Sequence, residues 1–166
     1  AAVGMARGVE ALGFKAEIKW PNDLYLGGKK AAGILIESAA RGEGAFAVVG
    51  IGLNVNQTAF PPELADRATS LRIRNGGNLL DRREVAVALV SALDALYSRV
   101  ETDFGALVEE ATERSVLIGR WIEVRTPAGE WRGLAEGLEP DGSLRLRTEA
   151  GGVMILAGGE VSVLQW

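Results

Sequence analysis

The chain has 166 residues, of which 48% are hydrophobic and 24% charged, a composition typical of one ordinary globular unit or two small ones. It contains neither cysteine nor histidine, which excludes disulfides, thiol nucleophiles, Cys/His zinc sites and every mechanism that uses a histidine base. Its net charge of −4 argues against a polyanion-binding surface. We expect a cytoplasmic protein without a membrane span, because no apolar run approaches roughly 18 residues and no signal-peptide pattern is present.

The first part of the sequence predicts one helix and then a hairpin. Residues 1–12 repeat apolar side chains every three positions, which is typical of an amphipathic helix. Residues 16–26 are strand-like, but Pro21 interrupts them, so the backbone must turn there. The pair Gly27-Gly28 predicts a tight reversal into a returning strand over residues 29–38.

Two features of the next strands bear on function. The run Ile34-Leu35-Ile36 predicts that the returning strand is buried. Residues 45–56 predict another strand, in which Gly50 and Gly52 leave the backbone bare on one face. Glycine weakens a strand interior, and one common reason to find it there is the close approach of a ligand or a second backbone.

Helices are predicted in the middle of the chain. Residues 57–78 are irregular around one short helix or strand. Asp81 and Glu84 then have the spacing of an N-terminal capping signature for a long helix. The apolar stripe of that helix comprises Val85, Leu89, Leu93, Leu96 and Val100. A second helix is predicted at about 103–116.

After Gly119 the hydrophobic period changes to two, and glycine-containing turns recur. Five short strands are predicted, at about 120–126, 131–138, 143–148, 153–157 and 161–165. Short strands joined by tight turns are typical of a small antiparallel barrel. We therefore predict one domain over residues 1–117 and a second over 118–166.

The segment richest in chemistry is Lys19-Trp20-Pro21-Asn22-Asp23 with the hairpin that follows it. The turn at Pro21 presents Asn22 and Asp23 at a strand edge, and Lys30 begins the return strand across the hairpin. A lysine can neutralise charge on a carboxylate or phosphate, and an aspartate can accept a proton or help to hold Mg²⁺. Gly33 would leave room for a flat or elongated ligand. From the residues alone, a simple hairpin with a surface ion pair remains an alternative.

A family resemblance favours a functional site here over a simple surface hairpin. The strings Lys-Trp-Pro-Asn-Asp, Lys-x-x-Gly-Ile-Leu-x-Glu, Val-Gly-Ile-Gly-Leu-Asn-Val-Asn and Gly-Gly-Glu occur in that order. In order and spacing they resemble the biotin–protein ligase (biotin–[acetyl-CoA-carboxylase] ligase) family. The resemblance covers the C-terminal half of that family's proteins. It implies an α+β chain: part of a class II synthetase-like catalytic domain, with a partial mixed or antiparallel sheet and helices, followed by an SH3-like barrel.

The resemblance also implies an activity. Members of the family join biotin to ATP with Mg²⁺, giving biotinyl-5′-AMP and pyrophosphate, and then transfer biotin to a lysine of a carboxyl-carrier domain. By position in the motifs, Lys30 would contact the biotin carboxylate and the adenylate phosphate, and Asp23 would assist the acceptor lysine or the metal. Asn22 and Asn54 would lie near the nucleotide, and Gly33 near biotin. Lys19 and Trp20 would shape the site.

The chain departs from the family pattern at its N-terminal side. The family's Gly/Arg-rich loop, which closes over biotin and phosphate, has no counterpart in these residues, and neither does the DNA-binding domain of some members. We therefore expect the 166 residues alone not to catalyse ligation. Family members often pair through their central sheets, so the resemblance also implies a homodimer.

Two other readings remain. A lipoate–protein ligase-like enzyme would also form an acyl-adenylate and modify a carrier lysine, although the Trp-Pro-Asn-Asp form of the motif and the terminal barrel favour biotin. A non-catalytic interaction module would bind a protein through the barrel and would not bind nucleotide.

Overall fold

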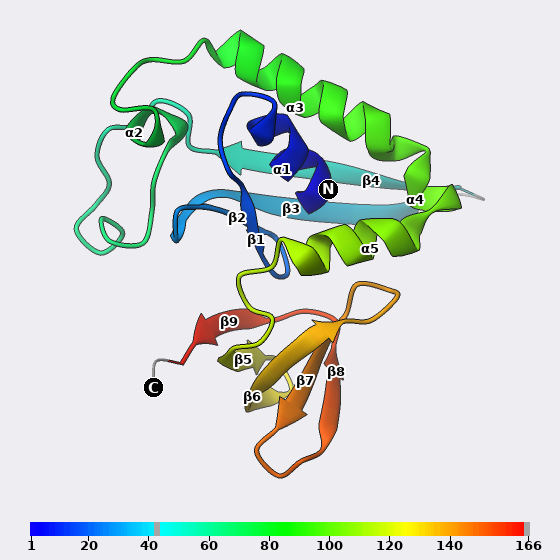
Figure 1. The fold of residues 1–166 in the computed structure, drawn as a ribbon. Coiled ribbons are helices and arrows are strands. Elements are labelled where there is room, and N and C mark those ends of the chain that lie inside the picture. The colour runs from blue at the N-terminus through cyan, green and yellow to red at the C-terminus, as the bar shows by residue number, and fades with distance from the viewer. Residues whose placement is uncertain (42–43, 165–166) are drawn as a thin grey trace. The chain divides into compact units, whose positions relative to one another are not determined.

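The computed structural model describes residues 1–41 and 44–164, and these form two compact units (Figure 1). The first unit comprises residues 1–18 and 22–96, and the second comprises 19–21 and 97–166. One detail of the predictions, the last residue of the final strand at 165, lies outside the described residues. None of the described helices is long and apolar enough to cross a membrane.

The first sheet has four strands in the order β1-β2-β3-β4. They are β1 (Glu17–Lys19), β2 (Asp23–Leu26), β3 (Lys29–Arg41) and β4 (Gly44–Leu53). Strand β3 pairs antiparallel with β2 and with β4. The turn between β2 and β3 has φ of 57° at Gly27 and 78° at Gly28. Glycine adopts such left-handed conformations without the steric cost that most residues pay, and the predicted reversal at Gly27-Gly28 is confirmed.

Three helices accompany this sheet: α1 (Ala2–Glu10), α2 (Leu71–Arg74) and α3 (Arg82–Tyr97). Helix α1 is largely buried and lies close to α3, because a Cβ added at Gly8 would come within 2.8 Å of Leu89 Cα. The predicted cap of α3 is confirmed, since the Arg83 N–H donates to Asp81 Oδ1 at 2.8 Å. This backbone hydrogen bond is the main cause that lowers the pKa of Asp81.

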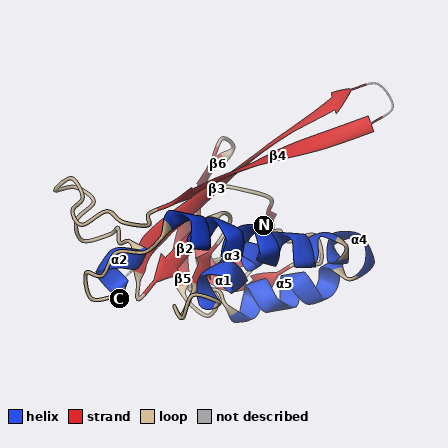
Figure 2. Ribbon diagram, turned by 90° about the horizontal axis from the view of Figure 1, so that it is seen from above, coloured by secondary structure: helices blue, strands red, loops and turns tan. Residues whose placement is uncertain are grey.

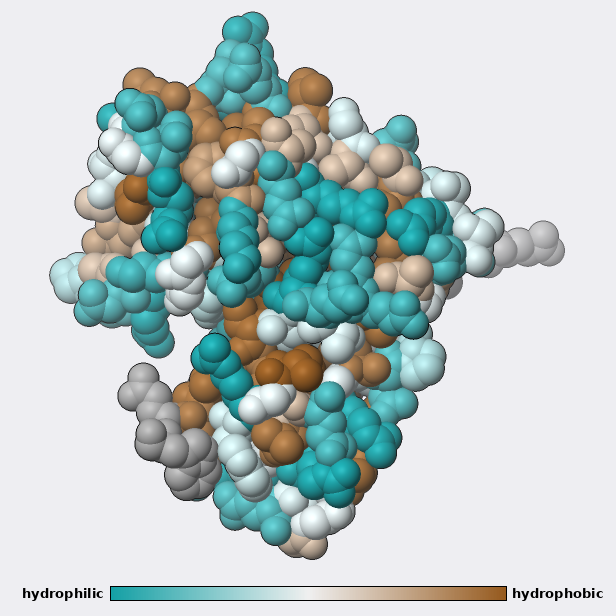
Figure 3. Space-filling view, viewed as in Figure 1, coloured by the Kyte–Doolittle hydropathy of each residue, from teal (hydrophilic) through white to brown (hydrophobic). Residues whose placement is uncertain are grey.

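The apolar stripe of α3 is shorter and less covered than predicted. Val85 and Leu96 are buried, but the helix ends at Tyr97. Val100 belongs to a separate short helix and is 51% exposed, so its place in the stripe is wrong. Val87 and Val90 are exposed, and apolar side chains lie along α3 in the space-filling view (Figure 3).

The prediction of a buried strand at Ile34-Leu35-Ile36 is correct only for Ile34. Leu35 is 63% exposed and Ile36 is 55% exposed, although neighbouring residues of a strand point to opposite faces. The far half of the β3–β4 hairpin extends past α1 and α3 (Figure 2), so neither of its faces is covered within the first unit. A continuous apolar run is typical of a strand that is covered on both faces, whereas this part of β3 is covered on neither face within the first unit.

The second unit contains two helices and a five-stranded antiparallel sheet in the order β8-β7-β6-β5-β9. Its elements are α4 (Arg99–Thr102), α5 (Phe104–Glu113), β5 (Trp121–Thr126), β6 (Gly129–Leu138), β7 (Leu144–Thr148), β8 (Val153–Leu156) and β9 (Glu160–Val163). The five predicted strands and the predicted second helix are thus present. The buried side chains of the strands, among them Ile122, Val124, Leu144 and Leu146, form one core together with Leu117, which precedes β5.

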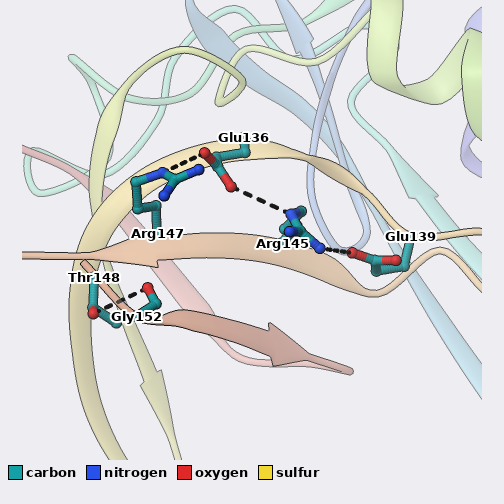
Figure 4. A network of polar contacts seen from close by, with 6 residues as sticks. All are labelled: Glu136, Glu139, Arg145, Arg147, Thr148 and Gly152. Carbon is teal, nitrogen blue, oxygen red and sulfur yellow. Dashed lines mark hydrogen bonds and ion pairs between the residues drawn. The ribbon is translucent and has the colours of Figure 1, made fainter. Parts of the chain in front are cut away.

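Ion pairs connect the outer side chains of this sheet. Glu136 accepts from Arg147 Nε at 2.6 Å and from Arg145 Nε at 3.3 Å, and Arg145 also reaches Glu139 at 2.9 Å (Figure 4). Hydrogen bonding from Arg147 is the main cause that lowers the pKa of Glu136. The network therefore holds Glu136 in its charged form.

Candidate active site

An ion pair between Asp23 and Lys30 marks the candidate site in the first unit. Lys30 Nζ lies 2.6 Å from Asp23 Oδ1, across the β2–β3 hairpin. The side chain of Lys30 is 46% exposed and that of Asp23 is 17% exposed. The pair is therefore assembled by local hairpin geometry, with the ammonium group still accessible to an anionic ligand.

Gly33 lies on the same face as this pair. A Cβ added at Gly33 would come within 3.5 Å of Asp23 Oδ1 and of Lys30 Nζ. In a regular strand, two residues three apart would point to opposite faces. The register against β2 is irregular between Leu24 and Tyr25, so that Ala31 has no partner on β2, and this places Lys30 and Gly33 together. We call this surface of the sheet the site face.

Three glycines continue the site face away from the ion pair. Gly33 is the cross-strand partner of Gly52, and Gly50 is the partner of Leu35. Since residues two apart on paired strands share a face, Gly33, Gly50 and Gly52 form one surface of open backbone, bordered by the side chain of Leu35, which we call the glycine floor. A Cβ at Gly52 would meet nothing nearer than Gly33 O at 3.9 Å, so packing within the chain does not require this glycine.

Asn22 fixes the start of β2. Its backbone oxygen accepts the Ile34 N–H at 2.8 Å, and its Nδ2 donates to Ile34 O at 2.8 Å. This double connection places Asp23 next to β3. The structure thus gives Asn22 a clear local role, while its predicted contact with nucleotide stays a prediction.

Asn54 directly follows β4 and is also held by the chain. Its Nδ2 donates to Thr69 O at 3.1 Å, and its Oδ1 accepts from Gln57 Nε2 at 3.3 Å. Thr69 and the neighbouring Ser70 are buried, and Ser70 Oγ caps α2 by accepting the Ile73 N–H. The sequence did not predict a role for Thr69 and Ser70, because they lie in an irregular segment without a recognisable pattern.

The other two predicted site residues, Lys19 and Trp20, belong to the second unit. Trp20 is 7% exposed and is part of that unit's hydrophobic core. Its indole Nε1 donates to Gly142 O at 3.0 Å. Trp20 therefore has a packing role in the second unit, and its part in shaping a ligand site stays a prediction, as does that of Lys19.

Tyr25 is a residue of the site face that the sequence reading missed. It lies two residues beyond Asp23 on β2 and opposite Lys30 on β3. Burial, reinforced by the negative charge of Asp23, raises the pKa of Tyr25, and the charge of Arg67 opposes that shift. The phenol is therefore neutral at physiological pH. The alternation of Asp23 and Tyr25 along one strand could have revealed it.

The chemistry of the site is that of one carboxylate and one ammonium beside open backbone. Among the described residues, no group of three or more Asp or Glu side chains could hold a metal ion by itself. Asp23 supplies one carboxylate, which suits Mg²⁺ only if phosphate oxygens complete its coordination. The arrangement can bind an elongated anion and can move a proton.

Comparison with known proteins decides which family this geometry belongs to. A family model described as "Biotin/lipoate A/B protein ligase family" matches residues 1–54, and one described as "Biotin protein ligase C terminal domain" matches residues 117–164. The chain belongs to the biotin protein ligase family. The matches include the Asp23–Lys30 pair, the glycine floor and the five-stranded sheet.

Relatives of the family match nearly all of the chain. The bifunctional ligase/repressor BirA of Bacillus spizizenii is 38% identical over 156 residues, which is 91% of this chain and 48% of that protein. The biotin–[acetyl-CoA-carboxylase] ligase of Paracoccus denitrificans is 35% identical over 167 residues, covering 94% and 65% of the two chains. The chain thus spans about half the length of the Bacillus relative.

A solved biotin protein ligase has the same fold. The structure of the Aquifex aeolicus enzyme in complex with biotin and ATP superposes with a TM-score of 0.84 at 27% identity, and the match covers 99% of this chain and 69% of that one. The α+β fold class expected from the sequence, a class II synthetase-like ligase fold followed by a small C-terminal barrel, is confirmed.

Proposed function

We propose that the full-length protein is an ATP-dependent biotin–protein ligase. The observation that carries the proposal is the Asp23–Lys30 pair at one end of the glycine floor. A bare floor admits a flat ring and a chain, and the cation lies where the carboxylate of such a ligand would end. The match to a biotin protein ligase C-terminal domain supports biotin over lipoate as the acid.

In the first step, a biotin carboxylate oxygen attacks the α-phosphorus of ATP, and pyrophosphate leaves. This step brings two anions together, and Lys30 lowers the barrier by offsetting their repulsion. Mg²⁺, held by Asp23 and phosphate oxygens, would supply further positive charge to the phosphates. Binding and electrostatics can carry the step without an enzyme nucleophile, in agreement with a chain that lacks cysteine and histidine.

In the second step, the amine of a carrier-domain lysine attacks the acyl carbon of biotinyl-5′-AMP, and AMP leaves. The amine must lose a proton as the amide forms, and Asp23 accepts or orients that proton. We propose that Asn22, Asn54, Lys19 and Trp20 contribute to the nucleotide and biotin surroundings, as their motif positions imply.

The proposal also includes the domain division, the site of action and the oligomeric state. Residues 1–117 are the C-terminal part of the catalytic domain, and 118–166 are the SH3-like barrel. The protein acts in the cytoplasm on a biotin carboxyl-carrier domain. It pairs as a homodimer, and the exposed apolar side chains of the β3–β4 hairpin, such as Leu35 and Phe46, support a protein-covered surface there.

The test separates the two steps. Exchange of labelled pyrophosphate into ATP is measured for the full-length protein with biotin, with lipoate and with no acid, followed by mass spectrometry of a carrier domain. We expect exchange with biotin alone and a mass gain of one biotin on the carrier. Exchange with lipoate alone would support the lipoate ligase reading instead. Carrier binding without any exchange would support the non-catalytic module.

A further inference from the structure

Ala31 is an extra residue in the returning strand of the site. Leu24 lies opposite Ala32 and Tyr25 lies opposite Lys30, so Ala31 is left out of the β2–β3 ladder. One additional residue on one strand is a β-bulge, a feature that redirects the side chains next to it. Ala31 and Ala32 are both buried, at 0% and 2% exposure, although neighbours in a regular strand would face opposite sides.

On the side of β3 that faces β4, Ala31 does take part in the ladder. The Asn54 N–H donates to Ala31 O at 2.9 Å, which continues the β3–β4 register by one position. The backbone of Lys30 serves a different segment: its N–H donates to Arg67 O at 2.8 Å, and its carbonyl accepts the Thr69 N–H at 2.8 Å. The backbone amides of Asn54 and Thr69 therefore donate to two different carbonyls.

These bonds connect the two sides of the candidate site. Thr69 O accepts from the side chain of Asn54, so Asn54 is fixed from two directions. The backbone N–H of Asn54 donates to Ala31 O. Its side chain donates to Thr69 O, and the Thr69 N–H in turn donates to Lys30 O. If β3 had no extra residue, Lys30 would lie opposite Tyr25 on one side and opposite Asn54 on the other. Its single carbonyl would then have to serve both Asn54 and Thr69.

We propose that Ala31 is a positioning residue of the site: its extra place in β3 gives Asn54 a backbone anchor separate from that of Thr69, and the bulge admits this extra residue without moving Lys30 off the face of Asp23. Ala31 is fully buried, so it acts on the site through the backbone hydrogen bonds of its neighbours. The catalytic value of this arrangement rests on the proposed function, whereas the arrangement itself can be tested in the 166-residue chain without substrate.

The test is deletion of Ala31, with Ala31→Gly as the matched control that keeps the residue count and the carbonyl. Two signals are followed by nuclear magnetic resonance. One is the Overhauser contact between the Lys30 ε-methylene and the Gly33 α-protons. The other is hydrogen exchange of the Asn54 and Thr69 amides, which reports their backbone hydrogen bonds.

In the deletion variant we expect the Lys30–Gly33 contact to persist, because the two residues are then two apart in a regular strand. At least one of the two amides, Asn54 or Thr69, should exchange about tenfold faster or more, because one carbonyl must serve both. In Ala31→Gly both amides should keep most of their protection. Full protection of both amides after the deletion, or loss of the Lys30–Gly33 contact, would overturn the proposal.

A second variant covers the case in which the deletion prevents folding. Replacing Asn54 by its α-hydroxy acid removes the N–H donor and leaves Ala31 in place. We expect the Thr69 amide to stay protected and the Lys30–Gly33 contact to remain, because the Lys30 carbonyl serves Thr69 independently. Loss of Thr69 protection in this variant would contradict separate anchors. Neither readout depends on ligase activity, so a failure here differs from a failure of the proposed function.

Discussion

Glycine has opposite uses in the two sheets of this protein. In the five-stranded sheet, a Cβ added at Gly133 would collide with the backbone of Arg147, and one added at Gly159, directly before β9, would lie 2.9 Å from Arg125 O. In the four-stranded sheet, the glycine floor meets nothing closer than 3.5 Å. Packing requires the first set of glycines. The second set leaves space that the chain itself does not fill, as a ligand surface does.

The charged side chains of the two sheets also differ, in how completely they are paired. In the second unit, Glu123 and Glu136 are each held by two arginines, and the buried carboxylate of Glu123 has its charge matched. In the first unit, the side chain of Lys30 pairs with Asp23 alone among the described residues, and it remains about half exposed. A saturated network stabilises a fold, whereas an accessible cation beside open backbone is suited to binding.

The largest effect expected from removing a side chain is at the accessible cation. In the full-length protein, Lys30→Ala should lower the rate of biotin-dependent pyrophosphate exchange by roughly 10²–10³-fold, the usual cost of removing one group that stabilises transition-state charge. Because the side chain is 46% exposed, the thermal midpoint should change little. Normal exchange in this variant would show that Lys30 has no part in adenylate formation.

Glycine substitutions test the comparison at the level of stability. Gly133→Ala should lower the free energy of unfolding by about 1–3 kcal/mol, because the new methyl group overpacks against backbone that cannot rotate away. Gly52→Ala, the matched change on the glycine floor, should change it by less than about 0.5 kcal/mol, as for other uncrowded surface positions. Urea titration of each variant measures both. Equal losses would mean that the floor, too, is required for packing.

A smaller effect is expected from pH in the second unit. Arginine hydrogen bonds hold the pKa of Glu136 below its ordinary value of 4.5, so the folded state binds fewer protons here than the unfolded state. The resulting stabilisation is complete above about pH 4.5 and is lost as pH falls through the lowered pKa.

The variant Glu136→Gln should therefore be less stable than the parent chain at pH 7, and the difference should shrink toward pH 2. Thermal unfolding at several pH values provides the measurement. A difference that stayed constant across this range would mean that the arginine pairs contribute nothing through the charge of Glu136.

Local patterns were sufficient to predict most of the secondary structure. The Gly27-Gly28 turn, the Asp81 cap and the five short strands each depend on residues near one another in sequence. The pairing of Asp23 with Lys30 also followed, because a hairpin brings its own ends together. These features required no knowledge of distant packing.

The features that the sequence reading missed depend on tertiary context. Leu35 and Ile36 have the composition of a buried strand, but burial depends on what covers it, which the local pattern does not contain. Trp20 lies in the motif of the site, yet its partner Gly142 is 122 residues away. The bulge at Ala31 was also missed, since a spacing of three between Lys30 and Gly33 does not reveal which residue is looped out.

The central claim is that the glycine floor holds the acid to be activated, with Lys30 at its end. The most direct measurement is biotin-dependent exchange of pyrophosphate into ATP by full-length Gly52→Val, together with its urea midpoint. We predict that exchange falls to background while the midpoint stays close to that of the unmodified protein, because the added side chain occupies ligand space and not core. Undiminished exchange in a folded Gly52→Val protein would contradict the claim.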